Sequence, residues 1–236
     1  MRERELFDAA GPETDAGDLE QLLERLEEIS PGARDNAICA LLSALVPRET
    51  VRRFAEKVLA AGEQAGAKTE AGRAAAENAA NDRLDPDTEK VLSAAYKTAR
   101  EFDRLRGLLR FKPEPAPDST EHRRYTARCA PDHFVLPLLA DHFSARFGQT
   151  PWAVIDEKRR LVLSGGGKKP AKITPCTGPP PPDDAENNPA RYAEFDRWET
   201  LWRTFHHAVN NESRNNADLQ KQFLPVRYRK YVTEFF

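Results

Sequence analysis

Hydrophobic residues recur at helical spacing over most of the first hundred positions. Leucine, isoleucine, valine and phenylalanine return every three or four residues, a period that predicts amphipathic helices with one buried face. We expect these helices at residues 18–28, 34–45, 51–61 and 86–104. Pro47 should end the second helix, and the sequence Asp85-Pro86 is a favourable start for the fourth.

Residues 62–82 differ from their neighbours because alanine, glutamate and glycine dominate them. Their propensity favours a helix, but they offer no face of large apolar side chains. We therefore expect a flexible or solvent-exposed segment here.

The period shortens after residue 106. Residues 107–112 and 125–129 alternate as short strands do, and the Pro-rich stretch PEPAPDSTEH between them is typical of a hairpin loop. A helix should begin near Phe134, because Pro137 is tolerated in a first turn, and Gly148 should end it. Residues 152–155 and 160–163 predict a second hairpin.

This order of elements predicts an α+β fold. A helical N-terminal part is followed by a small antiparallel sheet, strand-strand-helix-strand-strand, packed by C-terminal helices. We expect an acidic, partly flexible helical region at 1–96 and an α+β domain at 97–236. A Gly/Pro-rich loop should occupy 164–190, with helices near 188–210 and from Pro225.

The first part of the chain is acidic and the second part is basic, with the change near the predicted boundary between the helical region and the α+β domain. Of its 236 residues, 1–101 hold 14 Lys and Arg against 21 Asp and Glu, whereas 102–236 hold 22 against 17. All five histidines also lie in the second half. A basic second half favours an anionic partner such as a nucleic acid, while ordinary surface charge is the alternative explanation.

Several classes of protein are excluded or disfavoured. No apolar run is long enough for a transmembrane helix, and the acidic start is unlike a signal peptide. The chain has three cysteines, an odd number, and they lie far apart at Cys39, Cys129 and Cys176. This spacing argues against a disulfide framework and against a cysteine zinc site. It favours a location in the reducing cytoplasm. The familiar hydrolase, metalloprotease, dinucleotide and deaminase motifs are absent, and GGGKK lacks the spacing of a phosphate loop.

The nearest approach to a catalytic constellation is Asp132-His133 followed by Asp141-His142. On one continuous helix the two histidines would be about 900° apart, on opposite faces, so we predict no metal site and no cofactor. His142 and Arg146 share a face that suits an anion. The alternative for each histidine is a structural role beside the core.

Basic and amide side chains form a second group of candidates. Arg110 stands among apolar residues in a predicted strand, where a guanidinium can reach a phosphate or carboxylate. The C-terminal tail interleaves cations and amides with tyrosines, a pattern typical of surfaces that follow a nucleic-acid backbone. The residues concerned include Arg214, Asn216, Gln220, Arg227 and Lys230. Burial of Tyr228 and Tyr231 by a terminal helix is the alternative, and both can hold together.

Four stretches in order resemble a known family. They are RGLLRF, YTARCAPDHFVLPLLADHFSARF, PWAVIDEKRR and LWRTFHHAVNNESRNNADLQKQFLPVRYRKYVTEF. Together they resemble the bacterial "probable DNA metabolism protein" family, a domain of unknown function, over about residues 97–236. The resemblance implies a partnership with a radical-SAM protein similar to DNA-repair lyases, and a similar domain occurs fused to uracil-DNA-glycosylase-like proteins.

By matching position, the resemblance singles out a set of polar residues. These are Glu101, Arg110, His133, His142, Arg146, Asp156, Arg160, Arg214, Asn216, Gln220 and Glu234. The chain departs from the family pattern at four positions: Asp103 replaces a histidine, Leu108 a phenylalanine, Phe134 an asparagine and Arg229 a tryptophan.

Three functions follow as expectations. The first is a DNA-binding accessory protein in DNA repair or base modification that presents DNA to a partner enzyme, with no membrane partner. The second is an enzyme acting on nucleic acid, with His133 or His142 and Asp132 or Glu101 as acid–base groups and Arg110 or Arg146 stabilising negative charge. The third is an adaptor that binds only proteins.

Overall fold

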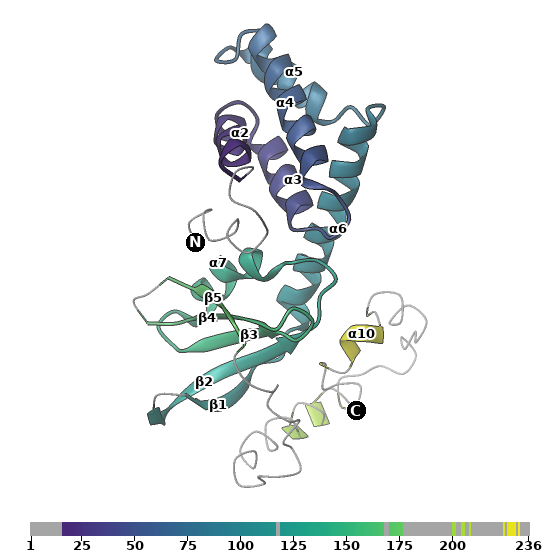
Figure 1. Ribbon diagram of the computed structural model, residues 1–236. Coiled ribbons are helices and arrows are strands. Elements are labelled where there is room, and N and C mark those ends of the chain that lie inside the picture. Colours follow the sequence, from purple (N-terminus) through teal and green to yellow (C-terminus); the bar gives the residue numbers. More distant parts are fainter. Residues whose placement is uncertain are drawn as a thin grey trace. The chain divides into compact units, whose positions relative to one another are not determined.

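The computed structural model describes residues 16–116, 119–167, 170–176, 200–201, 204–205, 208, 224, 226–229 and 231 (Figure 1). The chain divides into two compact units. Unit 1 comprises Met1–Arg104 and Asp132–Pro137, and unit 2 comprises Leu105–Pro131 and Leu138–Phe236. Each unit is therefore built from two separate stretches of sequence.

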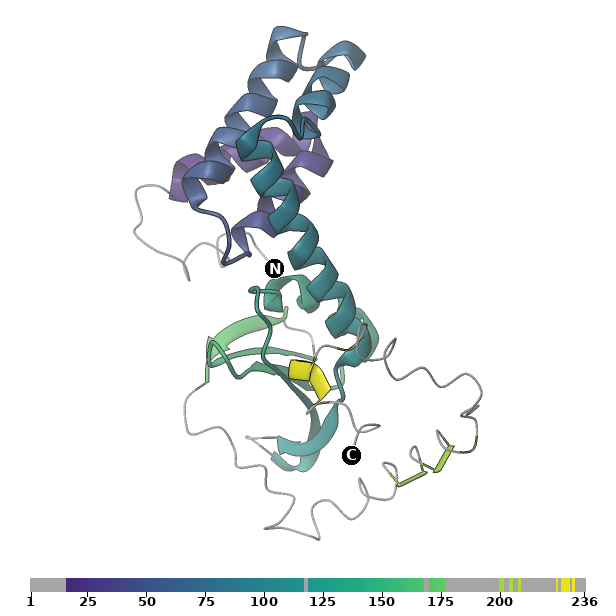
Figure 2. The ribbon, with the colours of Figure 1, turned by 90° about the vertical axis from the view of Figure 1, so that its right-hand side faces the viewer.

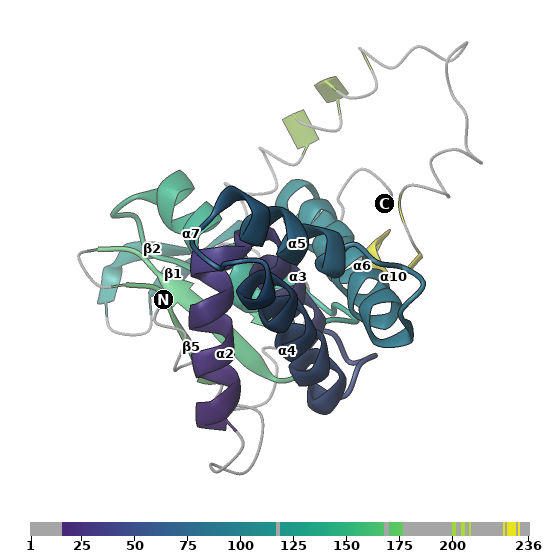
Figure 3. The ribbon, with the colours of Figure 1, turned by 90° about the horizontal axis from the view of Figure 1, so that it is seen from above.

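Unit 1 is helical. Its helices are α2 (Ala16–Ile29), α3 (Pro31–Leu41), α4 (Arg48–Gln64), α5 (Glu70–Ala80) and the first part of α6 (Pro86–Leu108). Helix α4 contacts α2, α3 and α5, an arrangement that Figure 3 shows from above. The four helices predicted from hydrophobic spacing are present. Helix α3 begins at Pro31, where Ser30 caps it by accepting the N–H of Ala33, and it ends at Leu41. The prediction that Pro47 ends this helix is wrong, because Pro47 is instead the N-cap residue of α4.

The core of unit 1 consists of the apolar stripes that defined these helices. Phe54 and its helical neighbours Val51 and Val58 are fully buried, together with Leu23 and Leu26 of α2. Burying a side chain of this size stabilises the fold by roughly 1.5–3 kcal/mol. The packing of these apolar stripes against one another therefore holds the helices of unit 1 together.

Residues 62–82 correct the expectation of a flexible or solvent-exposed segment. They contain the last turn of α4 and all of α5, and Ala76 and Ala80 of α5 are fully buried. Gly62 and Gly72 lie at the contact between the two helices, where a Cβ on Gly72 would be 2.9 Å from the Gly62 carbonyl oxygen. A helix of small residues thus packs by close approach of its backbone, with no large apolar face.

Unit 2 is built around one five-stranded sheet, drawn in teal and green in Figure 2, and Figure 1 labels its strands in the order β1-β2-β3-β4-β5. The strands are β1 (Lys112–Ala116), β2 (Ser119–Cys129), β3 (Trp152–Asp156), β4 (Leu161–Gly165) and β5 (Lys172–Pro175). Helix α7 (Leu136–Phe147) connects β2 to β3. The predicted α+β class, with helices first and strand-strand-helix-strand-strand after them, is confirmed.

The sheet differs from the prediction in two respects. It is mixed, because β2 and β3 run parallel while every other pair is antiparallel. The crossover through α7 returns the chain to the end of the sheet at which β2 begins, so β3 runs in the same direction as β2. A fifth strand, β5, also lies inside the stretch 164–190 that was predicted to be a loop.

The first strand begins later than expected. Residues 107–108 complete α6, and β1 (Lys112–Ala116) shares only Lys112 with the predicted strand, its other four residues lying in the stretch predicted to be a hairpin loop. Two prolines, Pro113 and Pro115, caused the error, because proline breaks the ladder of a central strand. Strand β1 is at the edge of the sheet, where proline is tolerated.

One face of the sheet packs against α7. Phe111, Phe143 and Phe147 form a ring cluster, and Phe147 also stacks on Tyr125 and Trp152. Because side chains alternate along a strand, the residues between these positions lie on the other face. We call this other face, defined by Lys112, Glu114, Arg124, Thr126 and Arg128 on β1 and β2, the outer face.

The described C-terminal residues also join unit 2. Helix α10 (Val226–Arg229) begins after Pro225, as predicted, and its Tyr228 is buried. Most of the helix expected at 188–210 lies outside the described residues. Among the helices in the described ranges, none combines the length and the apolar character needed to cross a membrane.

Candidate functional site

Glu101 of α6 organises the loop between β2 and α7 within unit 1. One carboxylate oxygen accepts the N–H of Asp132 at 3.0 Å and the other accepts the N–H of His133 at 2.7 Å. The side chain is only 3% exposed, so these two bonds replace the water that an ionised carboxylate requires. Three predicted site residues, Glu101, Asp132 and His133, are thereby brought together.

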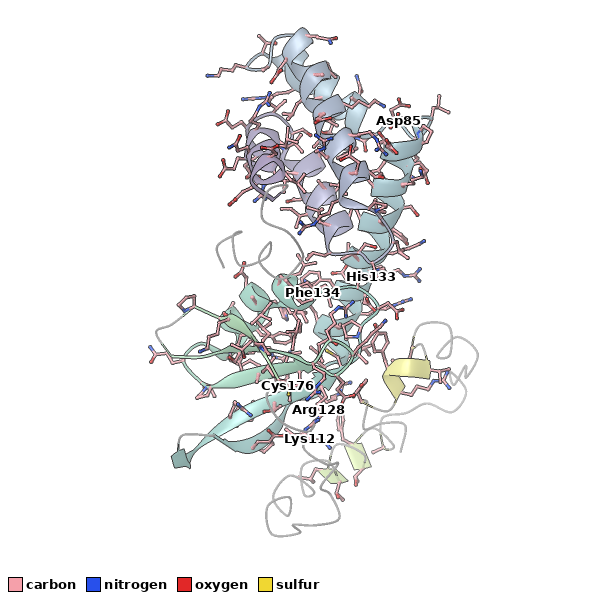
Figure 4. All side chains as sticks on the ribbon, in the orientation of Figure 1. Asp85, Lys112, Arg128, His133, Phe134 and Cys176 are labelled. Atoms are coloured by element: carbon pink, nitrogen blue, oxygen red, sulfur yellow. The ribbon has the colours of Figure 1, made fainter. Side chains whose placement is uncertain are left out.

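The imidazole ring of His133, labelled in Figure 4, makes a contact different from that of its backbone N–H. Its Nδ1 lies 3.3 Å from Ser43 Oγ, which also accepts the N–H of Leu45. The next residue, Phe134, donates its N–H to the carbonyl of Leu42 at 2.8 Å. The loop is therefore joined both to α6 and to the turn after α3.

This geometry limits the chemistry of the cluster. In a nucleophile–base–acid triad the carboxylate orients the imidazole ring, whereas the Glu101 contacts given above are to backbone N–H groups. Ser43 and His133 are both buried. The visible role of Glu101 is to position the loop that carries His133.

His142 is placed in unit 2, beside two arginines. It lies on α7 with Arg146 one turn later, and its ring meets that of Phe143 edge-on at 4.9 Å. Burial lowers the pKa of His142 from its ordinary value, and the positive charges of Arg106 and Arg146 lower it further. The predicted shared face of His142 and Arg146 is therefore positively charged, with Arg106 at the end of α6 adding to it.

The other described arginines of the predicted site are dispersed within unit 2. Arg110 donates to the carbonyl of Gly107 at 2.8 Å and so closes the end of α6. Arg160 is exposed in the turn between β3 and β4, where its φ of 55° fits a left-handed turn position. Arg214, Asn216, Gln220, Lys230 and the side chain of Arg227 lie outside the described residues.

A polar network surrounds the turn after β3. Asp156 is fully buried, accepts the N–H groups of Lys158 and Arg159, and pairs with the Arg159 guanidinium at 2.9 Å. Next to it, Glu157 accepts the hydroxyl of Tyr231 at 2.5 Å and lies 3.6 Å from Arg128. Burial and Glu157 raise the pKa of Tyr231, so its hydroxyl remains a donor. This network fastens Tyr231 to the turn after β3.

The surroundings of two of the three cysteines, Cys39 and Cys129, disfavour a nucleophilic role. All three are free, and Cys129 is fully buried on β2. Burial, with a contribution from Asp35, raises the pKa of Cys39 to about 11, which keeps it a thiol at neutral pH. Within the described ranges, no three His, Cys, Asp or Glu side chains gather as a metal site would require.

Sequence reasoning missed the cations of the outer face. Arg124, Thr126 and Arg128 alternate along β2, and Lys112 is paired with Thr126 across the β1–β2 ladder. The signal was present in the sequence RYTAR, where polar residues at every second position mark one face of a strand. The pattern is short, and the cations of Arg110 and the C-terminal tail are more conspicuous in the sequence.

The fold and its clusters define a two-unit α+β protein with a positively charged second unit. The family model described as a domain of unknown function (DUF4130) matches residues 67–234, and the chain belongs to this family. The match includes α5 and α6 of the helical unit, upstream of the motif series that begins near residue 97. Comparisons with the curated proteins and with the solved structures give no match.

Proposed function

We propose that this protein binds DNA as an accessory protein in DNA repair or base modification, holding a DNA segment for a partner enzyme. The observation that carries the proposal is the cationic face of α7. Two guanidinium groups act on the half-buried imidazole of His142, and both Arg106 and Arg146 are exposed. A phosphate group at this face would meet two guanidiniums and an imidazole able to accept a proton.

Two further features support the proposal. The second half of the chain has an excess of five positive charges, and unit 2 lies almost wholly within it. The resemblance to the "probable DNA metabolism protein" family implies a radical-SAM or uracil-DNA-glycosylase-like partner. Such a partner would supply the chemistry, and this chain would supply the contact with DNA.

The test is fluorescence anisotropy with labelled single-stranded, duplex and uracil-containing DNA over a salt series. We expect affinity to fall steeply with salt, because each phosphate contact releases condensed counterions. Arg146→Gln should lower the slope of log affinity against log salt by about 1. Arg73→Gln, the same change at an exposed position of α5, is the control and should leave the slope unchanged.

Two results would overturn the proposal. One is no binding at low salt, and the other is binding that does not depend on salt. Co-purification with a radical-SAM or glycosylase partner in the absence of DNA affinity would instead identify a protein-only adaptor.

One contact favours the alternative of an enzyme acting on nucleic acid. Ser43 Oγ lies within hydrogen-bond reach of His133 Nδ1, and a hydroxyl beside an imidazole can serve nucleophilic or acid–base chemistry. Turnover of modified oligonucleotides, abolished by His133→Ala or His142→Ala in a folded protein, would establish it. Full activity in both variants would exclude these histidines.

A further inference from the structure

Tyr125 of β2 belongs to the aromatic cluster between the sheet and α7. Its ring stacks on that of Phe147, with the centroids 5.8 Å apart and an interplanar angle of 29°. Phe147 also contacts Phe111, Phe143 and Trp152, whereas Tyr125 has no second ring neighbour among the described residues. Tyr125 is therefore attached to the cluster through one ring only.

The side chain of Tyr125 reaches the protein surface. The residue is half-buried, and its hydroxyl is neither buried nor hydrogen-bonded within the described part of the chain. Its N–H donates to the carbonyl of Pro151 at 2.9 Å, which places Tyr125 beside the exposed residues Gly148, Gln149 and Thr150. A tyrosine that is fixed by one aromatic neighbour and open to solvent is available to stack with a further planar group.

The cationic face of α7 adjoins this ring. Arg146 directly precedes Phe147, so the two side chains point about 100° apart around the helix. Arg146 is exposed and forms no ion pair within the described ranges, and His142 lies one turn before it. Asp141, the only carboxylate of α7, is about 140° from Arg146 around the helix. Positive charge therefore lies next to an aromatic surface.

Positive charge beside a solvent-accessible aromatic ring is the combination with which proteins bind single-stranded nucleic acids. We infer that single-stranded DNA is the form that the cationic face of α7 binds, with a phosphate at Arg146 and His142 and a neighbouring base stacked on Tyr125. In a duplex each base is stacked and paired inside the helix, so only a single strand offers its base to Tyr125. This inference rests on the proposed function and specifies the form of DNA that it concerns.

A comparison of ligands tests the inference without any substitution. Labelled oligothymidylate and an abasic oligonucleotide of the same length carry the same phosphate charges, but only the first can stack. We expect oligothymidylate to bind about 5- to 150-fold more tightly, which is the worth of one stacked base. Equal affinities for the two, or tighter binding of a duplex of that length at the same salt concentration, would overturn the inference.

Tyr125→Leu removes the aromatic ring and keeps an apolar side chain against Phe147. It should weaken the binding of oligothymidylate at least about fivefold. Its affinity for the abasic oligonucleotide and its salt slope should match wild type, because no phosphate contact is lost. An equal loss of affinity for both oligonucleotides would overturn the inference, since stacking acts on the first alone.

Two further variants accompany this test. Tyr125→Phe keeps the ring and should bind oligothymidylate as wild type does, so a loss as large as that of Tyr125→Leu would overturn the inference. Tyr96→Leu is the matched control, because Tyr96 is a 64% exposed tyrosine on α6. It should leave both affinities unchanged, and a loss equal to that of Tyr125→Leu would overturn the assignment to Tyr125.

The outcomes separate this inference from the proposed function. If neither oligonucleotide binds, the proposed function fails and this inference fails with it. If both bind equally, their affinity falls with salt and Arg146→Gln lowers the salt slope, the proposed function stands and only this inference fails.

Discussion

Glu101 accepts hydrogen bonds from the backbone N–H groups of Asp132 and His133, so a substitution of Glu101 should change the stability of the protein. In Glu101→Gln one of the two acceptor oxygens becomes an NH2 group that faces an N–H donor. We expect a loss of about 1–3 kcal/mol in the free energy of unfolding, since hydrogen bonds to a charged group are worth that much when buried. Urea denaturation measures it.

Glu24→Gln provides the control for this change, because Glu24 is exposed on α2. It should alter the free energy of unfolding by no more than about 0.5 kcal/mol. Equal stability of Glu101→Gln and Glu24→Gln would contradict the anchoring role of Glu101.

His142 makes DNA binding sensitive to pH. Its pKa in the folded protein is lowered by burial and by the two arginines, so the imidazole is mainly neutral near pH 7. A bound phosphate favours the protonated ring and raises that pKa, so DNA affinity should increase as the pH falls through about 6.5. Anisotropy titrations at several pH values, compared with His142→Gln, measure this.

Stability should respond to pH in the opposite direction. A histidine whose folded pKa is lowered binds its proton less readily than in the unfolded chain. The free energy of unfolding therefore decreases as the pH falls below about 6.5, the pKa of a histidine in the unfolded chain.

Arg146→Gln should raise the pKa of His142 toward its ordinary value, as an NMR titration of the ring protons would show. An unchanged pKa would mean that Arg146 does not act on the imidazole.

At the scale of elements, the contact between α4 and α5 depends on glycine. A Cβ on Gly72 would lie 2.9 Å from the carbonyl oxygen of Gly62 and closer still to that of Gly66. Since backbone atoms cannot yield, Gly72→Ala should destabilise the protein by about 1–3 kcal/mol. Thermal unfolding followed by circular dichroism measures the change.

Gly32 in α3 offers the matched control. A Cβ there would meet nothing within 4 Å, so Gly32→Ala should stabilise the protein by about 0.4–1 kcal/mol through the unfolded chain. If both alanine variants shift stability in the same direction, the close approach of α4 and α5 is not what requires glycine at 72.

Hydrophobic spacing predicted the helices because each one carries its own local pattern of apolar positions. It failed at α5, where small residues pack without a large apolar stripe, and at β1, whose prolines suit only an edge strand. The parallel pairing of β2 with β3 depends on contacts between distant residues, which no local pattern records.

The candidate site was predictable to a similar extent. The sequence grouped Asp132 with His133 and His142 with Arg146, and the structure places each pair on one loop or one helix face. The contact of Ser43 with His133 spans 90 residues and has no sequence signal. The sequence also does not show that Glu101 binds backbone N–H groups. A glutamate that binds the backbone and a catalytic glutamate are the same residue type in a sequence.

At the scale of the whole molecule, unit 1 is completed by a segment from the middle of the chain. A fragment ending at Arg104 lacks Asp132–Pro137, so Glu101 loses its two N–H partners and Leu42 loses the N–H of Phe134. We expect such a fragment to be less stable than unit 1 in the full chain by several kcal/mol, because it lacks two buried hydrogen bonds to the Glu101 carboxylate, each worth about 1.5–3 kcal/mol. Urea unfolding followed by the helical signal compares them.

Glu101→Leu supplies the control for this experiment. It should destabilise the full chain, where the N–H groups of Asp132 and His133 lose their acceptor, by more than it destabilises the fragment, which lacks both residues. An equal change in both would show that residues 132–137 do not complete unit 1.

The interrupted sequence of unit 1 also has a consequence for biosynthesis. Residues 105–137 must be added after Arg104 before unit 1 has all its parts. At a translation rate of about 5–20 residues per second, this takes roughly 2–7 s. During that interval Glu101 lacks the N–H groups of Asp132 and His133, and by its end β1, β2 and the start of α7 have been synthesised. The two stretches of unit 1 are therefore synthesised at different times, and the first two strands of unit 2 are synthesised between them.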